Sequence, residues 1–423
     1  MHKFVTHWLV NLARTDPSFQ ALVALDLCGC ISSVFVKALT DFVAVYLISD
    51  EKEEEGRGRG RGGAVEPSVI FPRLRRLCLR SVSSVPSTIL APFVLALPSL
   101  THLDLSCTRC TPELLNGLAT SPTVRLVALS LARCPRLTSE SVANLLINGE
   151  STRGLQQLSL FGDVTCCFPL TEEDLLQVVT QAPMFHTGKI SYLDISSNPV
   201  TPDLLAAIPV QPGLRSLGLS SIPNLPLNTI ADFLRTKAAN VEILTLVSSC
   251  PELSPPTSIR ESIFAIHNML VQPLCSVPFS LTAYSSLSPS TPGYHIPIPP
   301  RQTPTRLRVI EFQASMLSAL GGGAGSWQVI KSKGARGWFV DTASGWVAEP
   351  GTSTGGGSGG SSFQRELPLD HPLRQSLVWL SESGGNVSTG VGWHSRKVEV
   401  LRGHGLLGRD GGLYGAVSFS FAG

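Results

Sequence analysis

The sequence has few charged residues and almost no net charge. Only 15% of its 423 residues are charged, and 33 Lys and Arg stand against 31 Asp and Glu, which gives a formal net charge of +2. Domains that bind nucleic acid usually carry a clustered basic face. The balance therefore argues against a specific nucleic-acid partner, while a hydrophobic fraction of 43% is ample for a buried core.

Long apolar runs and a disulfide framework are also lacking. The apolar stretch at residues 34–48 is too short to span a bilayer and contains Lys37 and Asp41, so we predict no membrane association. Residues 1–14 have no long apolar core and no small-residue cleavage site, so they do not predict a signal peptide. Ten cysteines in 423 residues are no disulfide framework and instead predict reduced thiols in the cytoplasm, the nucleus or both.

Motifs for cofactors and metals are weak. The glycine run at residues 321–325 is followed by Ser-Trp, whereas a phosphate loop needs Gly-Lys-Ser/Thr. The G-x-G-x-x-G pattern that begins at Gly403 precedes a poor helix, so we interpret it as a turn. The single C-x-x-C, Cys107 to Cys110, lacks the second pair that a zinc site would need. The sequence therefore predicts no cofactor and no metal ligands.

Catalytic groups form no motif either. A small-molecule site, if the chain has one, would be sought at His394, His404, Arg409 and Asp410. Catalysis by such groups needs a nucleophile, a base and a group that orients the base. Because no such set is visible, we predict no catalytic residues and a protein that is not an enzyme.

What the sequence does contain is a repeated apolar phrase, L-x-x-L-x-L, at intervals mostly between 24 and 35 residues. Alternation within the phrase puts its last two leucines on one face of a short strand. A fixed phrase at such a period indicates a solenoid of strand-and-helix repeats. Its nine instances begin at Leu22, Leu74, Leu100, Leu126, Leu155, Ile190, Leu214, Val241 and Leu307.

A second shared phrase predicts a helix behind the strands. Thr111-Pro112-Glu113 and Thr201-Pro202-Asp203 stand at the same distance after a strand leucine. Threonine caps the first turn of a helix, proline already has a helical φ at the next position, and an acid favours the positive helix end. Thr171 and Thr138 start similar segments without the proline.

The residue three positions after the last strand leucine is expected to be small, polar and inward-facing, because it can bond the turning backbone. Val82 and Ile222 depart from this rule, and the positions that follow it are Cys30, Thr108, Cys134, Asp163, Asn198 and Ser249. The segment from Leu126 to Thr138 resembles the cysteine-containing leucine-rich repeat, and the helix-backed pattern is similar to the ribonuclease-inhibitor-like group. The resemblance covers about residues 19–315. It implies an α/β leucine-rich repeat solenoid with parallel strands on the concave face and helices on the convex face.

The remaining segments are interpreted as additions to the solenoid. Residues 1–18 would be a short N-terminal cap, and residues 316–362 a partly flexible segment with a strand pair near 337–347 and a Gly/Ser tether at 351–362. Residues 363–423 are predicted to form a small C-terminal α+β cap, because a bare terminal repeat would expose its core.

Two disordered insertions are predicted, at about residues 50–66 and 273–305. The step of 52 residues between the first two phrases could hide a degenerate repeat, but an insertion is preferred because residues 51–63 are low in complexity. Arg57, Arg59 and Arg61 could make a weak RNA contact, although a solvated loop is the favoured interpretation.

The leading hypothesis for function is a non-enzymatic scaffold that binds another protein on the concave face. The residues between the two inward leucines should be exposed there and offer polar, weakly charged contacts. These positions are Asp26, Cys78, Asp104, Ser130, Ser159, Asp194, Gly218 and Thr245.

Two alternatives follow from the resemblance. Cysteine-containing repeats resemble those of F-box proteins, which implies a substrate-recognition subunit of a ubiquitin ligase, although no F-box is visible before residue 19. The ribonuclease-inhibitor-like group includes an activator of the small GTPase Ran that ends in an acidic tail, whereas this sequence ends Phe-Ser-Phe-Ala-Gly423.

Overall fold

The structure is a computed structural model, and it describes residues 22–44, 47, 71–163, 165–254, 257–275, 304–321, 327–331 and 336–341. These residues belong to two compact units, divided between Ile222 and Pro223. We describe each unit by itself. Among the helices described, none has the length and apolar character needed to cross a membrane.

The described part of the first unit contains a ladder of three-residue strands. Each strand pairs in parallel with the next along the chain, and the register aligns the middle leucine of one strand with that of its neighbour. The strands are β1 (Ala24–Asp26), β2 (Arg76–Cys78), β3 (His102–Asp104), β4 (Ala128–Ser130), β5 (Gln157–Ser159), β6 (Tyr192–Asp194) and β7 (Ser216–Gly218).

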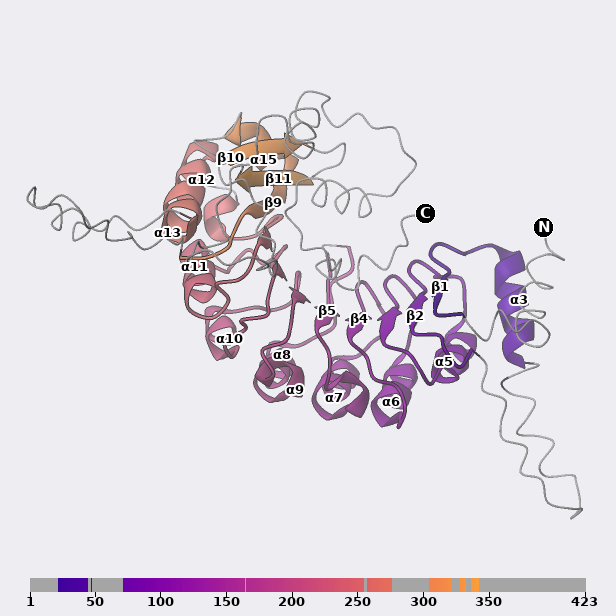
Figure 1. The fold of residues 1–423 in the computed structure, drawn as a ribbon. Coiled ribbons are helices and arrows are strands. Elements are labelled where there is room, and N and C mark those ends of the chain that lie inside the picture. The colour runs from indigo at the N-terminus through magenta and orange to yellow at the C-terminus, as the bar shows by residue number, and fades with distance from the viewer. Residues whose placement is uncertain are drawn as a thin grey trace, which may run out of the picture. The chain divides into compact units, whose positions relative to one another are not determined.

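Helical segments separate these strands along the chain. They are α3 (Ser33–Val43), α5 (Ser87–Leu95), α6 (Pro112–Thr120), α7 (Ser139–Asn148), η2 (Glu150–Thr152), α8 (Glu172–Gln181), α9 (Pro183–His186) and α10 (Pro202–Ala207). In Figure 1, helices α6 to α9 lie on the side opposite strands β2 to β5. The alternation of parallel strands and backing helices confirms the leucine-rich repeat solenoid.

The core of the first unit lies between the strands and the helices. The middle leucines are buried in every strand from β1 to β7, and so are the leucines that end each phrase, such as Leu79, Leu105 and Leu131. Helices contribute their inward residues, for example Leu114 and Leu118 of α6. Full burial of one leucine side chain is worth about 1.5–3 kcal/mol, so the repeated phrase and the inward side chains of the helices together supply the apolar driving force.

The turns after β3, β4 and β6 use the predicted inward residue. The Thr108 hydroxyl donates to the Leu105 carbonyl (2.7 Å), and the Cys134 thiol lies 3.0 Å from that same oxygen, one repeat away. The Asn198 amide donates across repeats to the Leu160 carbonyl (2.9 Å). These side chains satisfy carbonyls that the short strands leave inside the turn.

The predicted helix caps are confirmed with one exception. Thr138, Thr171 and Thr201 each accept a hydrogen bond from a backbone N–H of the first turn. Thr111 occupies the same N-cap position of α6 but makes no such bond. Its hydroxyl instead bonds the Glu113 carboxylate, which lowers the pKa of Glu113.

The second unit continues with one parallel pair and then changes direction. Strand β8 (Ile243–Thr245) pairs in parallel with β9 (Val309–Gln313), which pairs antiparallel with β11 (Arg336–Asp341), and β11 pairs antiparallel with β10 (Trp327–Lys331). Its helical segments are α11 (Leu227–Thr236), η3 (Pro251–Leu253), α12 (Ile259–Ala265), the π-helix η4 (Ile266–Val271), α13 (Gln272–Cys275) and α15 (Ala314–Leu320).

The additions to the solenoid are described only in part. Strand β1 pairs directly with β2, so no strand of a degenerate repeat lies between them in the sheet. A strand occurs near residues 337–347, but its partners are the upstream strands β9 and β10. The backbone N–H and hydroxyl of Thr305 both donate to the Leu274 carbonyl, so both ends of the insertion predicted at 273–305 are folded. Residues 342–347 of the expected strand pair, the cap segments 1–18 and 363–423, the tether, the insertion at 50–66 and residues 276–303 lie outside the described residues.

Candidate functional site: the strand face of the first unit

The strand face is the surface formed by the residues immediately before and after the middle leucine of each strand. Because side chains alternate across a strand, these residues point away from the leucine core. In the first unit they form two rows that run across β1 to β7. The sequence prediction named only the row that follows the middle leucine.

The structure places the named row together but buries most of it. Asp26 is exposed, and Asp194 is half-buried. The expectation of exposure is wrong for five of the eight residues, which are buried: Cys78, Asp104, Ser130, Ser159 and Gly218. Thr245 belongs to the second unit, where it is half-buried and its hydroxyl donates to Glu311 Oε2 (3.1 Å).

Contacts between neighbouring repeats contribute to this burial. The hydroxyls of Ser106 and Ser130 lie 2.6 Å apart, and Asp104 Oδ1 accepts the backbone N–H of Ser106 (2.8 Å). A Cβ added at Gly218 would collide with the carboxylate of Asp194, so the absence of a side chain at Gly218 leaves room for that carboxylate. The side chains of this row therefore mostly contact polar groups of neighbouring strands, and few of them are free.

The row that precedes the middle leucine was missed, and it is the more accessible one in β2, β3 and β5, whereas its member in β4, Ala128, is buried. Arg76 is exposed, while His102 and Gln157 are half-buried. Tyr192 is 8% exposed, and its hydroxyl bonds Asp194 Oδ2 (3.3 Å). The same alternation that identified one row could have identified this one, two residues earlier in each phrase.

Burial shifts the titration of two residues on this face. Desolvation raises the pKa of Asp104 to about 6, against the opposing hydrogen bonds from Ser106 and the charge of Arg80. Desolvation, with a smaller contribution from Arg76, lowers the pKa of His102 to about 4. At neutral pH His102 is therefore uncharged, and the charge at this position of the face comes from Arg76 and the aspartates.

Side chains that could hold a metal gather at the start of the first unit. One ligand atom each of Asp26, Cys28 and Cys78 lies within 4.8 Å of the others. The sequence prediction of no metal site looked for paired C-x-x-C motifs and so did not consider this set, whose members come from different repeats.

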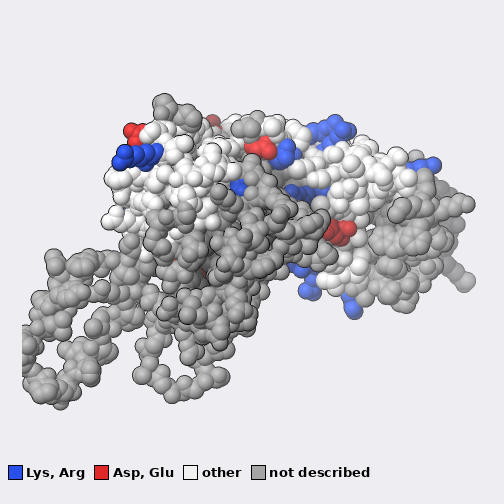
Figure 2. All heavy atoms as spheres, turned by 90° about the horizontal axis from the view of Figure 1, so that it is seen from above, with Lys and Arg blue, Asp and Glu red and all other residues white. Residues whose placement is uncertain are grey.

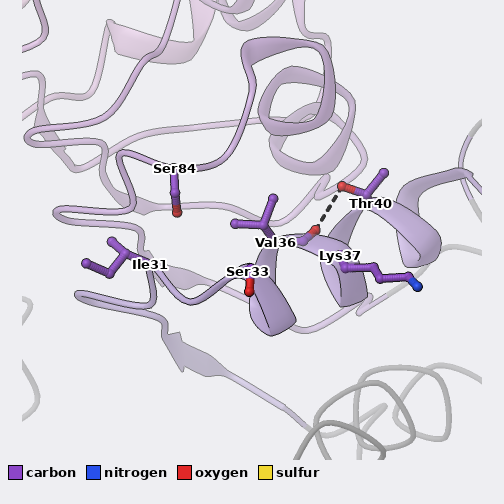
Figure 3. Close-up of a pocket in the computed structure, with 6 residues that line it drawn as sticks. All are labelled: Ile31, Ser33, Val36, Lys37, Thr40 and Ser84. Atoms are coloured by element: carbon purple, nitrogen blue, oxygen red, sulfur yellow. Dashed lines mark hydrogen bonds between the residues drawn. The ribbon is translucent and has the colours of Figure 1, made fainter.

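A pocket of about 500 Å³ lies between helix α3 and the turn that follows β2. Figure 3 shows that Thr40 points to the Val36 carbonyl, to which its hydroxyl donates (2.8 Å), and that the Lys37 amine points away from Ser84. The lining combines two aliphatic side chains, three hydroxyls and one lysine, a mixture that favours no particular chemistry. The residues are Ile31, Ser33, Val36, Lys37, Thr40 and Ser84.

Charge is dispersed on the face seen in Figure 2, where the Lys and Arg side chains of the described residues lie in separate groups among uncharged atoms. The remaining predicted sites lie outside the described residues. They are the possible RNA contact at Arg57, Arg59 and Arg61 and the cluster of His394, His404, Arg409 and Asp410.

Comparison with solved structures finds other leucine-rich repeat proteins. The leucine-rich repeat protein LegL7 of Legionella pneumophila is 18% identical with a TM-score of 0.32, and the match covers 57% of this chain and 69% of that one. Human 5T4 (trophoblast glycoprotein) is 17% identical with a TM-score of 0.26, over 44% of this chain and 64% of that one. A leucine-rich repeat protein of Leptospira interrogans is 16% identical with a TM-score of 0.22, over 49% and 73%. No protein-family model matches the chain, and no curated protein sequence does.

Proposed function

We propose that the protein is a non-enzymatic scaffold that binds another protein on the strand face of its first unit. The observation that carries the proposal is the row of Arg76, His102, Gln157 and Tyr192 on one surface of a parallel ladder. Arginine and tyrosine are the residues in which binding energy at protein interfaces most often concentrates. A rigid ladder holds them without the entropy cost of ordering a loop.

The second row takes a different part in this proposal. Asp26 and Asp194 keep their expected role as partner contacts, while the buried members fix the spacing of the strands. We expect the partner to meet hydrogen-bonding groups and a few isolated charges, since Arg76 stands beside the neutral His102.

The experiment compares two faces of the same unit. Partners are recovered by proximity labelling and mass spectrometry, and binding of the purified full-length chain to a recovered partner is then measured. Arg76→Glu and Gln157→Arg on the strand face should each weaken binding at least tenfold. Asn144→Arg, on the exposed side of α7, is the matched control and should leave binding unchanged. Equal binding by all three variants would overturn the proposal.

A more specific proposal is a substrate-recognition subunit of a ubiquitin ligase. It is supported by the cysteine-containing turn, in which the buried Cys134 thiol lies 3.0 Å from the Leu105 carbonyl, and by the resemblance of the sequence to cysteine-containing repeats. A stoichiometric complex with a ligase adaptor would support this role, and its absence among labelled partners would count against it. The ten free thiols further support a cytoplasmic or nuclear location, which fluorescence microscopy of the tagged chain would test.

A further inference from the structure

Two thiols and two carboxylates meet where the ladder begins. Asp26, Cys78 and Asp104 hold the same register position in β1, β2 and β3, so they lie side by side across three strands. Ligand atoms of Asp26, Cys28 and Cys78 are within 4.8 Å of one another, and Cys78 Sγ is 4.0 Å from Asp104 Oδ2. Asp26, Cys28 and Cys78 therefore share one small volume at the surface of the sheet, and Asp104 adjoins it beside Cys78.

Both carboxylates are held in place by the backbone of their own turns. Asp26 Oδ1 accepts the N–H of Cys28 (2.9 Å), and Asp104 Oδ1 accepts the N–H of Ser106 (2.8 Å). Each bond fixes one oxygen and so orients the other, and in Asp104 this second oxygen is the one that faces Cys78 Sγ. Hydrogen bonds that orient the ligands in this way are typical of metal sites in proteins.

The donor atoms in the cluster suit a cation. Asp26 and Asp104 supply carboxylate oxygens, and Cys28 and Cys78 supply sulfurs. Cysteine binds a metal ion as the thiolate, so a divalent cation would stabilise these groups in their charged forms.

We propose that Asp26, Cys28, Cys78 and Asp104 bind one Zn²⁺ ion. Thiolates select against Mg²⁺ and Ca²⁺, and a set of two sulfur and two oxygen ligands suits tetrahedral zinc. Zn–S bonds of about 2.3 Å and Zn–O bonds of about 2.0–2.2 Å place the ligand atoms roughly 3.3–3.8 Å apart. Asp26, Cys28 and Cys78 already lie within 4.8 Å of one another, and Asp104 would complete the set from beside Cys78.

The position of the site gives it a structural role. Asp26 and Cys28 are exposed and give the ion an entry path, whereas Cys78 and Asp104 are buried and form the floor. Among the described residues β1 pairs with β2 alone. Zinc would join β1 to β2 and β3, and each thiol that loses a proton to bind would release it to solvent.

The test uses the reduced full-length chain, freed of metal by a chelator and titrated with Co²⁺ and then Zn²⁺. We expect one equivalent of Co²⁺ per chain, with the intense visible absorption of tetrahedral cobalt and a thiolate-to-cobalt charge-transfer band, both abolished when Zn²⁺ displaces it. Cys28→Ser and Cys78→Ser should each lower the affinity for Zn²⁺ at least tenfold. Zinc should also slow hydrogen exchange in β1.

The matched control is Cys167→Ser, which removes an exposed thiol outside the cluster and should bind Zn²⁺ as the original chain does. Cys28 is exposed, so Cys28→Ser tests the site even if Cys78→Ser fails to fold. The proposal is overturned if Cys28→Ser binds Zn²⁺ with unchanged affinity. It is also overturned if Cys167→Ser removes the binding, or if Cys28 and Cys78 form a disulfide whose reduction does not allow the ion to bind.

Discussion

The two units extend their sheets in different ways. From β1 to β7 every strand of the first unit runs parallel to its neighbour, and helical segments separate consecutive strands. In the second unit β8 and β9 follow this rule, but β11 and β10 run antiparallel. Parallel neighbours need a long crossover, whereas antiparallel neighbours can be joined by a tight turn.

This difference distinguishes strands that let the ladder of repeats continue from strands that end it. Each parallel repeat adds a helix and leaves an apolar edge for the next repeat, so the ladder can continue. The antiparallel strands β10 and β11 add aromatic bulk instead, with Trp327, Trp338 and Phe339 all buried. In the second unit the change of direction accompanies an aromatic cluster in which the Phe339 ring contacts the rings of Trp327 and His267.

The largest effect should come from Phe339→Ala, which removes the centre of this cluster. The Phe339 ring lies 4.9 Å from that of Trp327 and 5.9 Å from that of His267, measured between centroids. Loss of a buried phenylalanine costs about 3–5 kcal/mol. Hydrogen exchange should show β9, β10 and β11 losing protection while β3 and β4 keep theirs. Phe264→Ala, which changes a ring 69% exposed in the same unit, is the control. Equal loss in both units would contradict a separate end structure.

Leu103→Ala should have a slightly smaller effect, confined to the first unit. Leu103 is fully buried in β3 and aligned with Leu77 and Leu129 of the adjoining strands. A leucine cavity costs about 2–5 kcal/mol, and nearest-neighbour coupling should spread the loss to β2 and β4 first. Urea denaturation with hydrogen exchange would measure it. Leu176→Ala, at a leucine 41% exposed on α8, should change stability by no more than about 0.5 kcal/mol.

The contrast between the units also shows how far the sequence could predict the molecule. The repeated leucines specify which side chains face the core, and the strands lie where the phrase placed them, from Leu25 to Ile310. The threonine caps and the inward polar residues followed from local rules about unpaired backbone groups. Each of these features depends on residues that are close together within a single repeat, so one sequence is enough to predict it.

Contacts between different repeats could not be predicted in this way. Alternation predicts the direction in which Asp104 and Ser130 point, but not the neighbouring side chains that bury them. The room beside Asp194 depends on Gly218 of the next strand. The cluster of Cys28 and Cys78 depends on β1 pairing directly with β2, across the insertion predicted between them. Pairing and register are needed before such contacts can be inferred.

A medium effect should come from Asn198→Ala in the turn after β6. Its amide donates to the carbonyls of Leu160 (2.9 Å) and Ser196 (3.2 Å). Its removal takes this donor from the Leu160 carbonyl, whereas the Ser196 carbonyl still accepts the N–H of Gly162 (2.9 Å). The expected cost is about 1–3 kcal/mol, measured by urea denaturation. Asn148→Ala, at an exposed asparagine bonded to Asn144, is the control and should be nearly neutral. If the two substitutions cost the same, the inward polar turn residue does not stabilise the ladder.

The smallest expected effect comes from comparing the two Thr-Pro-acid phrases of the first unit. Thr201 and Thr111 both precede Pro and an acid at a helix start, but only the Thr201 side chain accepts a backbone N–H, that of Leu204 (3.3 Å). Thr201→Ala should therefore cost about 1 kcal/mol, the usual value of a cap. Thr111→Ala should cost clearly less, because that hydroxyl bonds the exposed Glu113 carboxylate instead. The difference in urea midpoint between the two variants measures this. A larger loss of stability for Thr111→Ala than for Thr201→Ala would contradict this prediction. It would mean that the capping hydrogen bond does not determine how much each threonine contributes.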